Sequence, residues 1–313
     1  MKLLQDILYK AGIEDVVGST HIAIEHLCFD SRSVEQFSAF VAIRGVQVDG
    51  HAYIDQAIES GATAVVCETF PETFREKVTY VKVANGQRAL GQMAANFYGN
   101  PSEELELIGV TGTNGKTTTV TLLYELFEAL GKKTGLLSTV RNRIHRQTVA
   151  ATHTTPDALQ LNQLLREMVD QGCQYCFMEV SSHAIHQDRI AGLHFRGGVF
   201  TNITHDHLDY HKSFDEYIKA KKKFFDEIGS GAFALVNRDD FHSEVMVQNT
   251  TAKVKTYALK TLADFKGRIL ENQFSGLQLN IDGSEVWTKL IGGFNAYNVL
   301  AAYSVAVLLD KDG

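Results

Sequence analysis

The segment Gly109-Val-Thr-Gly-Thr-Asn-Gly-Lys-Thr117 limits the fold of this chain more than any other stretch of its sequence. The apolar residues 105–110 have the length of a buried strand, and residues 118–130 have the spacing of a helix. A glycine-rich turn between a strand and a helix is typical of a phosphate-binding loop, because its backbone N–H groups can point toward phosphate oxygens. We therefore predict such a loop at residues 109–117.

Each conspicuous residue of this loop has an expected role. Gly112 and Gly115 allow the turn, Lys116 supplies a cation, and the Thr117 hydroxyl suits Mg²⁺. The usual G-x-x-x-x-G-K spacing would require glycine at position 110, where this chain has Val110, so the loop is a variant. The alternative interpretation is a glycine-rich turn that binds no ligand.

The 313 residues are about twice the usual length of one domain, so we expect two domains. Gly, Asn, Pro and Ser cluster at residues 98–104, and we place the boundary there. Upstream, residues 39–43 and 62–67 have the composition of strands, with a helical pattern between them. Residues 1–100 are therefore predicted to form a small α/β domain.

Downstream of the boundary, apolar runs alternate with helical segments. This alternation is the signature of a mostly parallel sheet covered by helices on both faces. Residues 253–290 have shorter strands and turns such as Asp282-Gly283. We predict one central α/β domain over residues 101–313, with strands at residues 105–110, 134–137, 175–180, 198–203 and 232–236.

Composition and charge exclude several classes of protein. The net charge is −7, and neither part of the chain has the basic stripe of a nucleic-acid-binding protein. No apolar run approaches the roughly 18 residues of a membrane span, and the first ten residues do not resemble a signal peptide. We expect a cytoplasmic, monomeric protein with small-molecule partners and neither nucleic acid nor membrane among them.

The four cysteines are too few for a disulfide scaffold. Cys173 and Cys176 form a C-x-x-C, but no second pair accompanies them and an apolar run follows directly. We interpret them as a buried pair at a strand. A metal or redox site is the alternative.

Polar residues follow the third and fourth expected strands of the central domain. Ligands bind beyond the carboxyl ends of strands in open α/β sheets. A carboxylate and several imidazoles near a phosphate loop indicate a divalent metal, with Mg²⁺ favoured over zinc. A solvated loop with a helix cap is the alternative for the histidine-rich run. The residues concerned are Glu179, Ser181, Ser182 and His183, then Thr201, Asn202 and His205-Asp-His-Leu-Asp-Tyr-His211.

Lys221 falls in the middle of the apolar stripe of an expected helix at residues 214–228. A buried ammonium group is costly, so this lysine must snorkel to solvent, form a pair or change its chemistry. Its neighbours Lys219, Lys222 and Lys223 lie off the stripe, where a solvated charged face is the better interpretation.

Together these motifs resemble the Mur ligases, and the resemblance covers nearly the whole chain. Within that family, the run from Glu179 to Arg189 and the Asp-His-Leu-Asp-Tyr-His run are similar to the members that add the third amino acid. Residues 30–32 and 49–62 resemble the uridine-nucleotide domain of those members. The motifs are Gly112-Thr-Asn-Gly-Lys-Thr-Thr118, Glu179-Val-Ser-Ser-His183, Thr201-Asn202 with Asp206-His-Leu-Asp-Tyr-His211, Ala220-Lys221, and Gly293-Phe-Asn-Ala-Tyr-Asn298.

The resemblance implies an ATP-dependent, Mg²⁺-requiring ligase of peptidoglycan synthesis. ATP would phosphorylate the free D-glutamate carboxylate of UDP-N-acetylmuramoyl-L-alanyl-D-glutamate, and the amine of an amino acid would displace the phosphate. Meso-diaminopimelate is expected more than L-lysine, on its frequency among bacteria. The resemblance also implies a third domain after Gly313, so we expect these 313 residues by themselves to be inactive.

Roles for individual residues follow from the same resemblance. Lys116 would contact the ATP phosphates, Thr117 and Glu179 would serve one Mg²⁺, and His207 with a carbamylated Lys221 would serve a second. The expected catalytic residues are Lys116, Glu179, His207 and Lys221. The expected nucleotide-binding residues are Gly112, Thr113, Asn114, Gly115, Lys116, Thr117, Thr118 and Asn295, the last at adenine.

The resemblance assigns the sugar-peptide substrate to a further set of positions. Phe29, Ser31, Val46, Gln47 and Val48 would bind the uridine part. Thr154, Thr155, Ser181, Gln187 and Arg189 would hold the diphosphate and peptide, and this chain has His153 where relatives often have Asn.

Two other interpretations remain open. A folylpolyglutamate synthetase-like ligase shares the central layout, but it starts with its phosphate loop near the amino terminus. A non-catalytic nucleotide-binding module would not need Lys116, Thr117, Glu179, His207 and Lys221 together.

Overall fold

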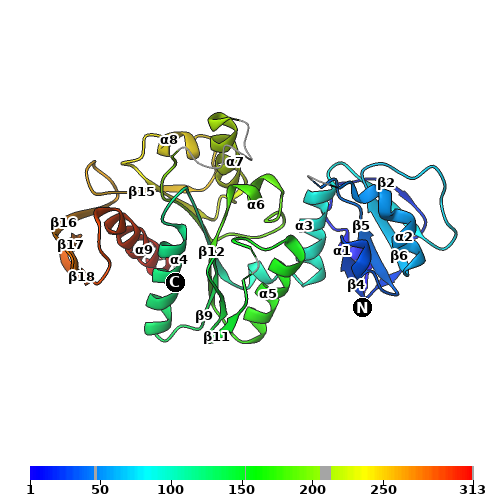
Figure 1. Cartoon of the computed structure of the whole chain (residues 1–313), viewed down its shortest axis with the longest axis horizontal. Coiled ribbons are helices and arrows are strands. Elements are labelled where there is room, and N and C mark those ends of the chain that lie inside the picture. Colours follow the sequence, from blue (N-terminus) through cyan, green and yellow to red (C-terminus); the bar gives the residue numbers. More distant parts are fainter. Residues whose placement is uncertain (46–47, 152, 205–212, 312–313) are drawn as a thin grey trace. The chain divides into compact units, whose positions relative to one another are not determined.

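The structure is a computed structural model that describes residues 1–45, 48–151, 153–204 and 213–311, and the chain divides into two compact units (Figure 1). Unit 1 holds Met1–Ser102, Pro156–Arg166 and Gln187–Leu193. Unit 2 holds Glu103–Thr155, Glu167–His186 and His194–Gly313. The predicted domains are contiguous in sequence, whereas unit 1 also takes two short segments from the later part of the chain.

Unit 1 is built on a five-stranded sheet with the order β2-β7-β6-β5-β4. Neighbouring strands from β4 to β7 are parallel, and β2 is an antiparallel edge strand. The bounds are β2 Ile13–Val17, β4 His26–Cys28, β5 Ser38–Val41, β6 Ala62–Cys67 and β7 Thr79–Val83, with a separate pair β1 Lys2–Leu3 and β3 Ala23–Ile24.

Helices cover both faces of this sheet, because alternate strand residues point to opposite sides. Val41, Val66 and Val81 pack in one apolar cluster with α3, and Phe40, Val65 and Tyr80 pack in another with α2. The helices are α1 Leu4–Ile7, α2 Ile54–Glu59 and α3 Gly86–Phe97, with 3-10 turns η1 Ser31–Ser33, η2 Gly50–Tyr53 and η3 Pro101–Glu103.

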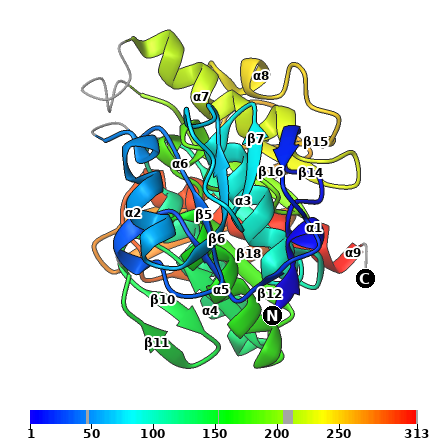
Figure 2. The same cartoon turned by 90° about the vertical axis from the view of Figure 1, so that its right-hand side faces the viewer.

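Unit 2 contains an eleven-stranded sheet in the described residues, with the order β11-β10-β9-β12-β8-β13-β14-β15-β16-β17-β18. The central strands from β9 to β16 are parallel, and antiparallel hairpins extend both edges; Figure 2 shows the β10–β11 hairpin. The bounds are β8 Glu106–Thr111, β9 Thr134–Leu137, β10 Asn142–Ile144, β11 Gln147–Val149, β12 Tyr175–Glu179, β13 Gly197–Phe200, β14 Phe233–Asn237, β15 Lys253–Ala258, β16 Phe265–Gln273, β17 Gly276–Ile281 and β18 Ser284–Thr288.

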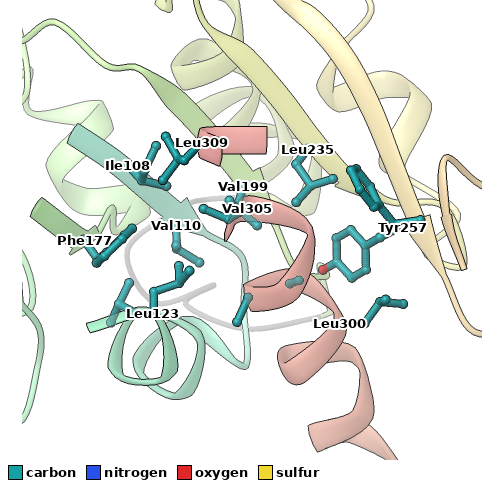
Figure 3. Packing of buried hydrophobic residues seen from close by; sticks show 14 of the residues in the cluster. Ile108, Val110, Leu123, Phe177, Val199, Leu235, Tyr257, Leu300, Val305 and Leu309 are labelled. Atoms are coloured by element: carbon teal, nitrogen blue, oxygen red, sulfur yellow. The ribbon is translucent and has the colours of Figure 1, made fainter. Parts of the chain in front are cut away.

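Two helices pack on each other and on one face of this sheet. They are α4 (Lys116–Ala129) and α9 (Gly293–Lys311). Leu123 of α4 and Leu300, Val305 and Leu309 of α9 fill one core with Ile108 and Val110 of β8 (Figure 3).

The other face is covered by α7 (Phe214–Glu227), whose Phe224 and Phe225 lie against glycines of the sheet. A side chain at Gly109 would come within 2.7 Å of Phe224, and one at Gly198 within 2.8 Å. Gly109 is therefore a packing residue of β8. The remaining helices are α5 Ala158–Asp170, α6 Ser182–His186 and α8 Ser243–Met246.

The predicted fold class is confirmed: a small α/β unit precedes a larger one with a mostly parallel sheet covered by helices. Strands 62–67 and 134–137 have the predicted bounds, and the helix expected at 118–130 begins two residues earlier at Lys116. Cys173 and Cys176 are both buried, as expected, and burial raises the pKa of both thiols. None of the helices in the described ranges is both long and apolar enough to cross a membrane.

Candidate functional site

The loop between β8 and α4 can be made only with glycine at two positions. Gly112 has φ +147° and Gly115 has φ +91°, both in the region that L side chains rarely adopt. A Cβ atom at Gly112 would overlap Thr201 Oγ1, and one at Gly115 would overlap Asn298 Oδ1. Helix α4 then begins at Lys116, so its free N–H groups face the loop.

The neighbouring strand β13 holds this loop in place through the residues that follow it. Asn114 N–H donates to Asn202 Oδ1 (3.0 Å), and Asn202 Nδ2 donates back to the Asn114 carbonyl (3.0 Å). Thr201 Oγ1 donates to the same carbonyl (2.6 Å), and Thr113 N–H donates to the Asn202 carbonyl (2.8 Å). The loop is thus preorganised by residues that the sequence placed at a strand end.

Two lysines converge on the loop. Lys116 Nζ donates to the carbonyl oxygens of Gly112 (2.8 Å) and Thr113 (2.9 Å), and Lys221 Nζ donates to the Gly112 carbonyl (3.1 Å). Lys221 is 1% exposed, and its Nζ lies 4.6 Å from the ring centroid of Tyr217. The snorkelling alternative is therefore wrong, since this side chain turns inward to the loop.

Glu179, at the end of β12, accepts hydrogen bonds from threonines of two other segments. Its Oε1 accepts hydrogen bonds from Thr117 Oγ1 (2.8 Å) and Thr139 N–H (2.8 Å), and its Oε2 accepts from Thr139 Oγ1 (3.2 Å). The glutamate is only 1% exposed. Hydroxyl and carboxylate oxygens at this spacing are the ligand type that Mg²⁺ prefers, so these residues fit such an ion.

The predicted Thr154, Thr155 and Ser181 lie beside this glutamate. Thr155 Oγ1 donates to the Glu179 carbonyl (2.8 Å) and accepts from Ser181 N–H (3.2 Å). Thr154 Oγ1 accepts from Thr139 Oγ1 (3.1 Å).

A cavity of about 750 Å³ opens next to the loop, within the size range of small-molecule sites. Asn114, Gly115 and Thr118 form its wall on the side of α4. The opposite lining comes from later segments: Thr201, Asn202, Asn237, Asp239, Asp240, Phe294, Tyr297 and Asn298.

Asp239 organises the far side of this cavity. Its carboxylate accepts backbone N–H groups of Leu259, Lys260 and Thr261 (2.8 Å each) and the hydroxyl of Tyr297 (2.9 Å). Burial alone would raise the pKa of Asp239, but these backbone hydrogen bonds hold it well below the usual range. Burial and the neighbouring carboxylate raise the pKa of Tyr297.

Asn295, expected at adenine, lies underneath the cavity. It is 8% exposed, and its Oδ1 accepts from Nδ2 of Asn298, which does line the cavity. Phe294 is 71% exposed at the cavity, so it is not a core residue.

Unit 1 has its own cavity, of about 530 Å³. Phe29, Ser31 and Val48 line it together with Tyr53 and Gln56. Val46 and Gln47, predicted for the same site, lie outside the described residues. Gln187 and Arg189, which also belong to unit 1, bond each other through Gln187 Oε1 (2.7 and 2.9 Å).

His207 and the rest of the run from His205 to His211 lie outside the described residues. Within the ranges that the structure describes, no group of three or more His, Cys, Asp or Glu side chains is arranged as a metal site. The predicted pairing of His207 with Lys221 therefore stays a prediction.

Sequence reasoning missed Asn237, Asp239, Asp240 and Thr139. The signal that could have found them was present. Asn237 ends β14 and the two aspartates follow it, while Thr139 comes two residues after β9. The polar residues predicted from strand ends follow only β12 and β13, which lie between β9 and β14 in the chain.

Comparisons with known proteins agree with this geometry. Residues 110–306 match the model of the Mur ligase middle domain, and residues 23–98 match the Mur ligase family, catalytic domain. The UDP-N-acetylmuramoyl-L-alanyl-D-glutamate--2,6-diaminopimelate ligase of Cytophaga hutchinsonii is 58% identical over 310 residues, and the protein of that name from Phocaeicola vulgatus is 53% identical over 308. These alignments cover 99% and 98% of this chain.

The match spans about 64% of the length of each of those relatives. A solved structure of a UDP-N-acetylmuramoyl-L-alanyl-D-glutamate--2,6-diaminopimelate ligase superposes with a TM-score of 0.86 at 28% identity, over 99% of this chain and 64% of that one. The middle-domain match alone takes in more than half of the 313 residues. The chain belongs to the Mur ligase family.

Proposed function

We propose that this chain carries the UDP-sugar and nucleotide sites of an ATP-dependent ligase that adds meso-diaminopimelate to UDP-N-acetylmuramoyl-L-alanyl-D-glutamate through an acyl phosphate. The names of the relatives at 58% and 53% identity support the choice of substrates. The observation that carries the proposal is the Thr117 and Glu179 pair beside the glycine loop and its cavity.

The nucleotide would bind with its phosphates at the loop and its base in the 750 Å³ cavity. Gly112 to Thr118 would contribute N–H groups and hydroxyls, and Lys116 would exchange its loop carbonyls for phosphate oxygens. Asn298, held by Asn295, and the exposed ring of Phe294 would receive the base.

Mg²⁺ would be held by Thr117 and Glu179, and when bound it supplies positive charge between ATP and the substrate carboxylate. Glu179 is kept in place by Thr139, so its second oxygen stays oriented. An unmodified Lys221 does not fit a second ion, because an ammonium group repels one.

Carbamylation would remove that conflict, and we include it in the proposal. The neutral Nζ of Lys221 would form a bond to the carbon of CO₂ and release a proton to solvent, leaving a carbamate anion. Its two oxygens are ligands of the hard type that Mg²⁺ prefers. His207 is proposed to serve the same ion.

The UDP-sugar would occupy the 530 Å³ cavity of unit 1. Phe29, Ser31 and Val48 line that cavity, and Val46 and Gln47 adjoin Val48 in sequence. Thr154, Thr155, Ser181, Gln187 and Arg189 are proposed for the diphosphate and peptide. The guanidinium of Arg189 suits an anionic ligand.

Two alternatives are weaker. The match of residues 23–98 to a Mur ligase domain disfavours a folylpolyglutamate synthetase-like ligase. The hydrogen-bonded pair of Thr117 and the buried Glu179, together with the inward Lys221, disfavours a module that only binds nucleotide. A cytoplasmic location and a monomeric state belong to the same proposal, and the four free buried thiols are consistent with a reducing compartment.

Calorimetry on the 313-residue chain tests the two sites separately. ADP with Mg²⁺ and UDP-N-acetylmuramoyl-L-alanyl-D-glutamate should each bind, and Lys116→Ala should weaken only the nucleotide. Binding of the nucleotide without any binding of the UDP ligand would contradict the proposed substrate and favour the nucleotide-binding module.

A further inference from the structure

The imidazole of His51 ties two segments of unit 1 together. Its Nδ1 lies 2.6 Å from Asp49 Oδ1. Its Nε2 accepts hydrogen bonds from the backbone N–H groups of Glu68 (3.0 Å) and Thr69 (3.4 Å), which follow β6. The side chain is 15% exposed.

These partners fix the protonation state of the ring. A backbone N–H can only donate, so Nε2 must carry a lone pair. The single ring proton is therefore on Nδ1, from which it is donated to the Asp49 carboxylate. His51 is a neutral imidazole in one tautomer, and both nitrogens are used.

The segment that His51 holds is one wall of the 530 Å³ cavity. Gly45 N–H donates to the Val48 carbonyl (2.9 Å) and Gly50 N–H to the Ile43 carbonyl (2.8 Å), which pairs residues 43–45 with residues 48–50. These two described stretches are called the cavity loop below. Ile43, Gly45, Val48 and Gly50 all line the cavity. Besides His51, Arg44 ties the cavity loop to its surroundings: its carbonyl accepts from Gln87 Nε2 (3.4 Å) and its Nη2 donates to Thr69 Oγ1 (3.2 Å).

Glu68 extends the link to a helix. Its Oε1 accepts from Gly86 N–H (2.9 Å) at the start of α3, and its Oε2 lies 3.4 Å from Arg44 Nε on the cavity loop. The loop, the end of β6 and the start of α3 therefore form one network, in which His51 supplies a side-chain acceptor for two backbone N–H groups.

We propose that His51 is a positioning residue for the UDP-sugar cavity, and that ligand affinity depends on its neutral state. The inference rests on the proposed function. Among the described residues, Asp49 is the charged group in contact with the ring, and Arg44 lies between Asp49 (3.8 Å) and Glu68 (3.4 Å). A proton on Nε2 would point at the N–H groups of Glu68 and Thr69 and would break both hydrogen bonds.

Two substitutions distinguish the role of Nδ1 from the role of Nε2. His51→Gln places an amide oxygen near the position of Nε2, so the two N–H groups keep an acceptor that cannot be protonated. His51→Asn places its amide near Nδ1 and leaves those N–H groups without a partner. The glutamine variant should bind like the wild type at about pH 8, and the asparagine variant about tenfold more weakly.

The experiment is calorimetry of the 313-residue chain with UDP-N-acetylmuramoyl-L-alanyl-D-glutamate from about pH 8 to about pH 5.5, the range in which imidazoles titrate. The affinity of the wild type for the UDP ligand should fall several-fold as pH falls. The affinity of the glutamine variant should not change with pH, because the ligand keeps its charge over this range. ADP binding at unit 2 should be equal in all three proteins at each pH, which controls for loss of folding.

The outcomes are distinguishable. If the wild type fails to bind the UDP ligand at about pH 8, the proposed function is overturned and this inference with it. If the wild type binds but all three proteins share one affinity and one pH profile, the proposed function stands and the role of His51 is overturned.

Discussion

Lys116 and Lys221 donate hydrogen bonds to one acceptor, the carbonyl oxygen of Gly112, although they lie on different helices. Two ammonium groups so close together repel each other, and Lys221, at 1% exposure, has little water to screen it. A carbamate at Lys221 would replace this repulsion with attraction. The pair therefore provides a local reason for the modification, independent of any metal.

Lys221→Ala should nearly abolish ligase activity in the whole protein, because it removes the proposed carbamate. A small carboxylate such as acetate should restore part of the activity by entering the space left by the side chain. Rates with and without acetate measure both effects.

The matched control is Lys222→Ala. Lys222 pairs with Asp226 (2.6 Å) on the same helix and should matter little. NMR with ¹³C-labelled bicarbonate should show one carbamate signal that Lys221→Ala removes. A wild-type protein without that signal, together with a fully active Lys221→Ala variant, would refute the modification.

Lys116→Ala should lower the rate of the whole protein on the order of 10³-fold, because it removes charge stabilisation at the transferred phosphate. The affinity of Lys116→Ala for the UDP ligand should be unchanged. The control is Lys132→Ala, at an exposed position, which should change neither the rate nor this affinity. A fall in UDP-ligand affinity as large as the fall in rate would show that the two sites are not separate.

Glu179→Gln should raise the Mg²⁺ concentration needed for half-maximal activity by about tenfold or more, because glutamine keeps the shape but loses the charge. A Mg²⁺ titration of the whole protein measures this. Glu244→Gln, at an exposed position of α8, is the comparison. Identical titration curves for the two variants would exclude Glu179 as a ligand.

Asp239→Asn should reduce the free energy of unfolding at neutral pH and weaken ADP binding, because segment 259–261 and Tyr297 lose their charged acceptor. The folded-state pKa of Asp239 is lowered, so its contribution is present above the ordinary carboxyl pKa of about 4 and is lost as pH falls below that. Urea denaturation at several pH values should show the two proteins converging at acid pH. A difference that stayed constant with pH would contradict the assignment.

The sequence was most informative where a local rule has a single solution. Gly112 and Gly115 are required by positive φ and close contacts, and Lys221 is inward because it shares a stripe with Tyr217 and Phe224. Such features depend on one helix or one turn, so spacing is enough to predict them.

Other features depend on residues far apart in the chain. Thr139 meets Glu179, and Asp239 meets residues 259–261, only after the strands have been ordered in the sheet. Spacing along the sequence does not show which strands become neighbours in the sheet or in what register they pair. The lining of the cavity by Asn298 was equally hidden, since Asn295 and Asn298 lie on one helix and only packing decides which of them borders the cavity.

The packing of α9 on α4 joins two segments that are synthesised at different times. Leu300, Val305 and Leu309 complete a core whose first strand, β8, begins about 190 residues earlier. A nascent chain leaves the ribosome from its amino terminus. The glycine loop and α4 are therefore synthesised long before α9, which packs on α4. Until then the part of α4 that contacts α9 is uncovered, although the strands β8, β9 and β12 can already pack on the helix. Synthesis of unit 2 therefore includes a period in which a chaperone has a surface to bind, and that period ends when the last turns of α9 emerge.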